Sequence, residues 1–411
     1  MDVVLRRNAA VLGSIALLCS IALAGWTKLT SGTMDDLRGV SFPEGTQVGY
    51  AVGAPASSGG SVYKTTDGGA TWVFQNPGTL MGLRAVFFKD DNNGVAVGDV
   101  GAIVMTTDGG ATWMKPASPT YDPLTYVSFP SKSHTVWIGV LHTDSLASVL
   151  KSTDGGSSWT YHVVGGPLDR STSAAFATDS QGVVVGVKGL VIGNSGYQNS
   201  GAPSATLAGA AFSPTNPDKG YLIGQDTVTG YGIVRYTATF GPIWDTVRCP
   251  YVAGGFHGIC MPLDTLAFIC GDSGFIGVTH SALEIWATKD RATTEPIYGL
   301  CFPHGGDTGY AVGGNGTILK TTDGGGPWVH GVAEEKAPAS LPAGIRVLSN
   351  PCRQGIALHT GASVPITVFD ATGRAVLSLT AVAGTKFLPV RRAGAYFVKS
   401  GAQTARAVVT D

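Results

Sequence analysis

The chain has 411 residues, of which 44% are hydrophobic and only 13% are charged, and it contains 59 glycines. This composition suits many short strands joined by tight turns, and it is a poor match for a helical bundle, whose exposed faces need more charge. The formal net charge of −1 provides no global field that would attract nucleic acid or an anionic membrane.

The first segment, residues 1–24, has the pattern of a signal peptide. Arg6 and Arg7 precede an apolar run over residues 9–24, which ends in the small-x-small sequence Ala-Leu-Ala. The run has about 16 residues, whereas a membrane-spanning helix needs roughly 20. We therefore predict export with cleavage after Ala24, and no stable transmembrane anchor.

A repeated unit occupies most of the remaining chain. Each unit begins with a six-residue apolar segment, and these segments start 36 to 49 residues apart. A second apolar segment that ends in glycine follows each of them, as at 52–53 and 97–98. A period in the low forties with several short strands is typical of a β-propeller blade. The first segments are 37–42, 83–88, 124–129, 171–176, 207–212, 256–261 and 297–302.

Four units continue into the sharper motif Thr/Ser-x-Asp-Gly-Gly-x-x-Trp. The first three aspartates are 41 and 46 residues apart, and the fourth follows after 169 residues, about four periods. Three units in this interval therefore carry altered turns, and we expect Trp244 and Trp286 to mark the outer strands of two of them. The motif residues are Asp67 and Trp72, Asp108 and Trp113, Asp154 and Trp159, and Asp323 and Trp328.

These motif residues are predicted to be structural. A short carboxylate in a tight turn accepts backbone N–H groups, and the paired glycines permit the positive φ angles that the turn needs. The tryptophan begins the next strand and packs beneath the turn. The alternative, in which the aspartates bind a metal or a sugar, fits less well because the turn recurs in many units whereas a ligand site is usually singular.

The motif resembles the Asp-box, or BNR, repeat of sialidases, xyloglucanase-type glycosidases, sortilin receptors and the photosystem II assembly and stability factor family. The last is the most similar in style, because its units also run from a Val-Gly strand end to Lys-Thr-Thr-Asp-Gly-Gly-x-x-Trp, as residues 64–72 and 320–328 do. The resemblance implies an all-β fold with a seven-bladed β-propeller over residues 25–333, with eight blades as the alternative.

Two segments compete to complete the ring of blades. Residues 26–33 begin with tryptophan and look like a fourth strand with no strands before it. An N-terminal strand that joins the last blade would leave no unpaired edge. Residues 328–332 are the other candidate for this place.

The C-terminal part of the chain has a different pattern. Residues 334–344 contain two prolines and three alanines and are predicted to be a linker. Residues 345–411 hold seven short apolar segments, whose lengths and turn spacing suggest a small Ig-like β-sandwich.

This tail resembles the C-terminal sorting domain of the type IX secretion system. The matching residues are Asn350 and Pro351, the segments 368–374 and 393–398, and a closing apolar strand. The resemblance implies passage through the type IX machinery to the outside or outer surface of a Gram-negative-type bacterium. An ordinary accessory sandwich is the alternative.

The sequence lacks a recognisable catalytic set. The propeller is poor in arginine and glutamate, and no spacing pairs its other carboxylates as glycosidases require. No CxxC or His-Glu-x-x-His pattern is present, so we predict no catalytic residue, metal or cofactor. Five cysteines remain after the signal peptide, and Cys260 and Cys270 are either a disulfide or buried free thiols.

Arg38 and Arg84 are the candidate binding residues. They occupy the same position in successive inner strands, so we expect them near one another beside the central channel. Paired guanidinium groups can hold a carboxylate through two hydrogen bonds each. In the photosystem assembly family an arginine-rich patch is linked to partner binding, whereas only two arginines repeat here, and solvated positions at blade edges are the alternative.

Together these features predict an exported, monomeric binding or scaffold propeller that recognises a protein or glycan at the cell surface. Its tail, residues 345–411, would engage the type IX machinery, and no nucleic acid partner is expected. Two other functions stay open: a degenerate sialidase-like glycosidase and a protein similar to the photosystem II assembly factor.

Overall fold

The chain falls into two compact units, Met1–Val332 and Ala333–Asp411, which are described separately. In the first unit the computed structural model describes residues 25–329 except 55–59, 131–132, 142–145, 167–168, 195, 199, 241–243, 248, 250–253, 282–283, 289–291 and 327. In the second unit it describes residues 345–347, 352–353, 355–360, 364–381, 384–389, 394–400 and 403–410. The predicted signal peptide and linker lie outside these ranges.

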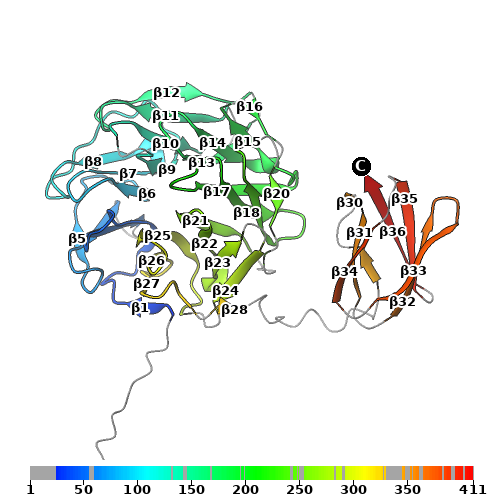
Figure 1. The fold of residues 1–411 in the computed structure, drawn as a ribbon. Helices are drawn as coiled ribbons and strands as arrows, with labels where there is room; N and C mark the ends of the chain where they lie inside the picture. Colours follow the sequence, from blue (N-terminus) through cyan, green and yellow to red (C-terminus); the bar gives the residue numbers. More distant parts are fainter. Residues whose placement is uncertain are drawn as a thin grey trace, which may run out of the picture. The chain divides into compact units, whose positions relative to one another are not determined.

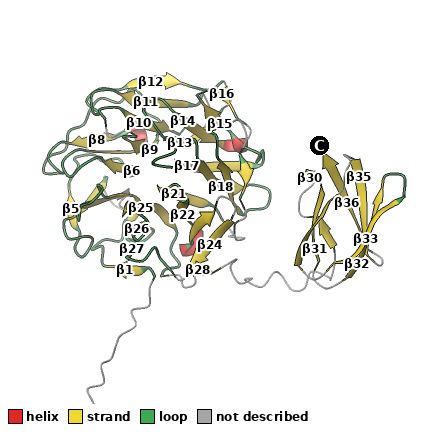
Figure 2. Ribbon diagram, viewed as in Figure 1, coloured by secondary structure: helices red, strands yellow, loops and turns green. Residues whose placement is uncertain are grey.

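The first unit is built from small antiparallel sheets with almost no helix (Figure 2). Its helical elements, among the residues described, are the single turns η1 (Asp99–Gly101), η2 (Val187–Gly189) and η3 (Asp272–Gly274). None of the described residues forms a helix long and apolar enough to cross a membrane. The strands are, sheet by sheet, β2 (Asp36–Ser41), β3 (Gly49–Ala54), β4 (Ser61–Thr65) and β5 (Val73–Gln75); β6 (Leu83–Phe88), β7 (Gly94–Gly98) and β8 (Ile103–Thr106); β9 (Leu124–Ser128), β10 (Val136–Val140), β11 (Ser148–Ser152) and β12 (Thr160–Val163); β13 (Ser171–Phe176), β14 (Gly182–Gly186), β15 (Val191–Gly193) and β16 (Gly196–Tyr197); β17 (Ala205–Phe212), β18 (Gly220–Asp226), β19 (Gly232–Thr237) and β20 (Asp245–Thr246); β21 (Phe256–Leu263), β22 (Leu266–Gly271), β23 (Ile276–Ser281), β24 (Glu284–Thr288) and β28 (Trp328–Val329); and β25 (Ile297–His304), β26 (Thr308–Gly313), β27 (Ile318–Thr321) and β1 (Thr27–Leu29).

The sheets surround a common centre. The first strand of each sheet contacts the first strand of the next, in the order β2, β6, β9, β13, β17, β21 and β25, and β25 contacts β2. Figure 1 shows β6, β17, β21 and β25 near the centre and β5, β12, β16 and β20 at the periphery. Second strands such as β7 and β14 are buried along their whole length, because neighbouring sheets cover both of their faces. This radial arrangement of antiparallel sheets is that of a β-propeller.

The N-terminal strand closes the ring. β1 pairs with β27, with Thr27 opposite Lys320, and so becomes the outermost strand of the sheet that begins with β25. Trp26 takes the place of a motif tryptophan in this sheet, since a Cβ added at Gly325 would lie 2.3 Å from its indole Nε1. The competing segment, which begins at Trp328, instead forms β28 and pairs with β24 as a fifth strand.

A phenylalanine at the end of the first strand joins neighbouring sheets. The ring of Phe88 stacks on Tyr50 of the preceding sheet with 3.5 Å between centroids, and Phe42 stacks on Tyr310 at 3.8 Å. The same ring covers a glycine of its own sheet, because a Cβ added at Gly94 would lie 2.5 Å from Phe88. A side chain at this position would collide with the Phe88 ring, which explains why the second strand begins with glycine.

The second unit consists of two sheets. The hairpin predicted around residues 370–374 is present, because β32 pairs with β33 and Asp370 accepts the backbone N–H of Thr372 at 3.0 Å. Ile366 and Val368 are at most 1% exposed and form part of its core. An Ig-like topology stays a prediction. The strands are β29 (Ile345–Val347), β31 (Gly355–Thr360) and β34 (Gly384–Pro389) in one sheet, and β30 (Cys352–Arg353), β36 (Gln403–Thr410), β35 (Gly394–Ser400), β32 (Val364–Asp370) and β33 (Ala375–Ala381) in the other.

Candidate binding site at the centre of the propeller

Each described first strand contains a β-bulge near its start, at an equivalent position in every sheet of the ring. A β-bulge leaves one residue unpaired in the ladder and re-aims its side chain. Because the first strands form the innermost ring, the bulged residues lie around the centre of the propeller, at one end of these strands. We call this set the bulge ring, and it consists of Arg38, Arg84, Thr125, Thr172, Ala208, His257 and Tyr298.

The structure brings Arg38 and Arg84 together on one carboxylate, Asp99. This residue begins η1, directly after β7, and its Oδ1 accepts a hydrogen bond from Arg84 Nε at 2.5 Å. Its Oδ2 lies 3.7 Å from Arg38 Nη1, and that buried nitrogen has no hydrogen-bond partner among the described residues. Two guanidinium groups therefore face one carboxylate, which leaves an excess of positive charge that a second anionic group could balance.

A parallel arrangement occurs in another sheet of the ring. Asp272 begins η3 as Asp99 begins η1, and its Oδ1 lies 2.8 Å from His257 Nε2. The ring of Tyr298 lies 5.5 Å from that of His257. Burial raises the pKa of Tyr298, and the nearby Asp36 carboxylate raises it further, so this phenol is neutral at physiological pH.

The other bulged residues are small and uncharged. Thr125 Oγ1 donates to the Thr172 carbonyl at 2.9 Å, and Thr172 Oγ1 donates to the Leu207 carbonyl. These hydroxyls tie successive first strands together, and Ala208 has no polar side-chain atom. The ionisable residues of the bulge ring are therefore confined to the arc formed by β21, β25, β2 and β6.

The structure brings the two arginines near one another, as the sequence led us to expect, but their shared partner Asp99 was not predicted. Asp99 and Asp272 stand outside the repeated motif, and no spacing in the sequence pairs them with a cation. The signal that identifies them is the pattern Gly-Asp-x-Gly at residues 98–101 and 271–274, directly after a second strand.

The Thr-x-Asp turns lie at the other ends of the strands and are closed by side-chain hydroxyls. Thr65 Oγ1 donates to Asp67 Oδ1 at 2.7 Å and accepts the N–H of Gly69 at 2.9 Å. Asp67 also accepts the hydroxyl and the backbone N–H of Thr71, at 2.7 and 2.9 Å. The bonds from Thr71 and Thr65 lower the pKa of Asp67 to about 2. Both carboxylate oxygens are thus engaged within the turn, which favours a structural role.

The same bonds recur in the two following turns, around Asp108 and Asp154. In the fourth, Thr321 bonds Asp323 and Gly325 in the same way. Among the residues that the structure describes, no group of three or more histidines, cysteines and carboxylates could hold a metal ion.

The turns also connect neighbouring sheets. Lys64 Nζ and Tyr50 Oη both donate to the carbonyl of Gly109 in the next turn, at 2.7 and 2.8 Å. Lys320 Nζ donates in the same way to the carbonyl of Gly68, at 2.6 Å, across the point where the ring closes. The lysine that precedes the motif therefore has a structural function in these sheets.

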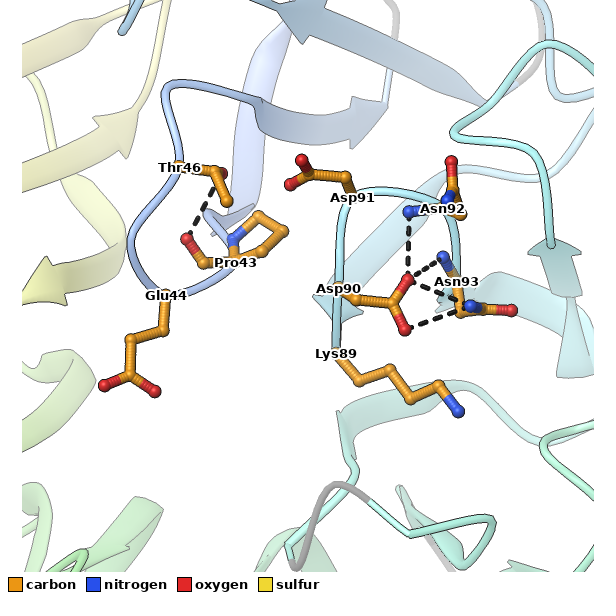
Figure 3. Close-up of a pocket in the computed structure, with 8 residues that line it drawn as sticks. All are labelled: Pro43, Glu44, Thr46, Lys89, Asp90, Asp91, Asn92 and Asn93. Atoms are coloured by element: carbon orange, nitrogen blue, oxygen red, sulfur yellow. Dashed lines mark hydrogen bonds between the residues drawn. The ribbon is translucent and has the colours of Figure 1, made fainter.

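A hollow of about 450 Å³ opens between two loops on this second face (Figure 3). Its lining contains Glu44, Asp90 and Asp91 but only one cation, Lys89. The side-chain amide of Asn93 bonds both oxygens of Asp90, at 2.9 and 3.0 Å. The hollow therefore offers no counterpart to the paired arginines of the bulge ring.

The cysteines whose side chains are described are free thiols. Cys260 and Cys270 lie on adjacent strands, but each is opposite a different residue in the ladder. Burial raises the pKa of Cys249 and of Cys301 to about 11. The structure therefore contains Cys260 and Cys270 as free thiols, which is one of the two predicted alternatives, and not as a disulfide.

Comparisons with known proteins support the fold. No family model and no curated protein matches the chain. Among solved structures, it is similar to YCF48 bound to D1 peptide, with a TM-score of 0.55 and 16% identity over 72% of this chain and 97% of that chain. YCF48 from Cyanidioschyzon merolae gives the same TM-score and identity, over 72% and 99%. The WD40 β-propeller domain of Doa1 gives 0.52 and 12%, over 73% and 98%.

At these identities the likeness concerns the fold alone. It confirms the all-β prediction and the β-propeller, including the expected similarity to the photosystem II assembly factor at the level of fold.

Proposed function

We propose that the chain is a seven-bladed Asp-box β-propeller that binds a protein or glycan at the cell surface, without a metal, a cofactor or catalytic activity. In this proposal a signal peptide and a type IX sorting domain in residues 345–411 direct its export. The closed order of first strands supports the count of seven blades.

The excess of guanidinium over carboxylate at Asp99 carries the binding proposal. Arg84 is bonded to Asp99, whereas Arg38 approaches it only to 3.7 Å and keeps an N–H group without a partner among the described residues. A carboxylate from a ligand at the exposed part of the Arg38 side chain would balance the second guanidinium charge. Binding of a D1 peptide by YCF48, which has a similar fold, supports a protein ligand over a glycan.

The test is capture of outer-surface proteins and glycans by the purified chain without residues 1–24. The double variant R38A/R84A is expected to lose specific capture, because it removes both guanidinium groups. R170A removes an exposed arginine outside the bulge ring and should bind as the parent does. Equal capture by the parent and the double variant would rule out the arginine pair as the site.

A degenerate sialidase-like glycosidase is the enzymatic alternative. Sialidases use a tyrosine–glutamate nucleophile, and Glu295 is close enough to Tyr298 to contribute to the raised pKa of that phenol. The raised pKa of Tyr298 makes its phenol a poor nucleophile at neutral pH, which argues against this chemistry. Hydrolysis of a sialoside that Tyr298→Phe abolishes would establish it.

A role in assembling a membrane protein complex is the second alternative, and the similarity in fold to YCF48 favours it. Co-purification with a photosynthetic complex from the host would support it. The resemblance of the tail to a type IX sorting domain argues for the cell surface instead.

A further inference from the structure

The four most exposed large apolar side chains among the described residues lie on one face of the propeller. Tyr121 is 87% exposed, Met34 and Val228 are each 81% exposed, and Leu80 is 79% exposed. Three of them precede first strands, and Val228 lies in the turn between β18 and β19. In an antiparallel sheet the start of the first strand and the end of the second lie at the same edge. This edge is also where the bulge ring lies.

Met34, Leu80 and Tyr121 occupy similar positions in three consecutive connections, which lead into β2, β6 and β9. We call these three residues the apolar arc. Exposed apolar residues that are scattered singly need no explanation, whereas three at similar positions on successive blades suit an interaction surface. The arc and the arginine pair lie at the same ends of β2 and β6, because Met34 shortly precedes Arg38 and Leu80 shortly precedes Arg84.

Two of these connections are held firmly in place. The carbonyl of Thr120 packs so closely on Gly101 that a Cβ added there would lie 2.0 Å from it, and Thr33 packs on Gly316 in the same way. The hydroxyl of Ser118 also donates to the Thr120 carbonyl, at 3.0 Å. A rigid support reduces the entropy that is lost when an exposed side chain becomes ordered on binding.

We propose that the apolar arc docks an extended segment of a partner protein, in which apolar side chains flank an acidic one. This inference rests on the proposed binding function and deepens it by naming the class of partner. The acidic side chain would pair with Arg38 and Arg84, which is the charge complementarity that selects this occupant. Its apolar neighbours would cover Met34, Leu80 and Tyr121, and the tyrosine is the kind of residue that dominates binding energy in protein interfaces.

A membrane surface fits the same face less well. A bilayer would bring many anionic headgroups against Asp36 and Asp99, which would repel them, whereas a single acidic side chain can be directed at Arg38 and Arg84. The protein partner is therefore the occupant that these charges favour.

The test uses synthetic peptides of about twelve residues with blocked ends, so that only side chains carry charge. The first peptide places one glutamate between leucine and phenylalanine residues, the second replaces the apolar residues by serine, and the third replaces glutamate by glutamine. Binding to the chain without residues 1–24 is measured by fluorescence anisotropy. The variants are M34S/L80S/Y121S, R38A/R84A and, as a matched control away from this face, V73S/F74S, which changes two exposed apolar residues of β5. Circular dichroism and thermal unfolding check that each variant is folded.

We expect the first peptide to bind most tightly and M34S/L80S/Y121S to weaken it by about tenfold or more, with V73S/F74S unchanged. R38A/R84A should weaken both glutamate peptides. If R38A/R84A weakens binding but the arc variant and the serine peptide behave like their parents, the arginine site stands and the apolar arc is overturned. If no peptide binds, the inference fails. Binding to phosphatidylglycerol vesicles that depends on the arc would also overturn it, in favour of a membrane surface.

Discussion

Side-chain hydroxyls decide the shape of each Thr-x-Asp turn. The sequence pointed to the aspartate, the glycines and the tryptophan, because these residue types have known preferences in tight turns. The structure adds Thr65, which bonds Asp67 and Gly69 at once, and Thr71, which donates twice to Asp67. Threonine is common in every part of a β protein, so its role became visible only from the geometry of the turn.

The low pKa of these carboxyl groups predicts acid sensitivity. The pKa of Asp67 and that of Asp108 are lowered from 3.8 to about 2 by bonds that exist only in the folded turn. Their contribution to stability is present above the unfolded pKa and is lost as the pH falls through the folded pKa, that is, between about pH 4 and pH 2. Urea unfolding of D67N/D108N should therefore depend less on pH in this range than unfolding of the parent.

The control for this prediction is D245N, which changes an exposed aspartate of β20 outside the turns. An equal pH dependence of the unfolding free energy in the parent and in D67N/D108N would contradict the prediction.

At the scale of strands and sheets, neighbouring blades are joined by phenylalanine rings that stack on a tyrosine of the preceding blade and cover a glycine of their own blade. The glycine at the start of a second strand has an ordinary extended backbone, so its conformation does not explain it. The explanation is the phenylalanine ring that lies over it, as Phe88 lies over Gly94. The contact packs the first strand of the blade against its second strand, and it positions the Phe88 ring to stack on Tyr50 of the preceding blade.

Replacing Gly94 by alanine should therefore be costly. The new Cβ would lie 2.5 Å from the Phe88 ring and would disturb its stacking, so we expect a loss of about 1–3 kcal/mol in the free energy of unfolding. G209A is the matched control in a first strand, because its Cβ would be 3.7 Å from the nearest atom. Chemical denaturation of both variants tests this, and a G94A protein as stable as G209A would disprove the packing explanation.

The sequence predicted the first and second strands of each unit well, because their apolar runs repeat with the blade period. The outer strands were harder to predict, since they are short and exposed. The fourth strand of the sheet that begins with β6 is reduced to a single bridge between Met105 and Met114. Pro116 follows shortly afterwards, and proline cannot donate to a ladder. The partners of the two arginines were also missed, because a bulge and a turn from different strands bring them together.

At the scale of the whole propeller, the N-terminal strand β1 completes the last blade. β1 pairs with β27, and Lys320 bonds the carbonyl of Gly68, so the last and first blades are joined by both backbone and side chains. The N-terminal tryptophan provided the sequence signal for this closure. Nothing in the sequence indicated that β28 would be a fifth strand. Trp328 follows a Thr-x-Asp-Gly-Gly turn, as do the tryptophans that precede fourth strands in other blades.

A proline in the closing strand should be more damaging than the same change elsewhere. Thr27 in β1 and Val73 in β5 occupy equivalent positions, opposite Lys320 and Lys64. V73P removes one ladder hydrogen bond at the edge of a blade, which costs about 1 kcal/mol. T27P removes the equivalent bond at the seam of the ring, and we expect a distinctly larger loss. Thermal unfolding compares the two variants, and equal losses would show that closure adds nothing to stability.

The closing strand also imposes an order on folding. Nearly the whole propeller sequence separates Thr27 from its partner Lys320, so β1 is synthesised first and paired last. Until the strands around residue 320 are present, Trp26 and its strand have no place to dock, and the growing ring keeps two open edges. If the chain crosses a membrane N-terminus first, β1 therefore emerges long before its partner β27. The ring can close only when almost all of the propeller sequence has crossed.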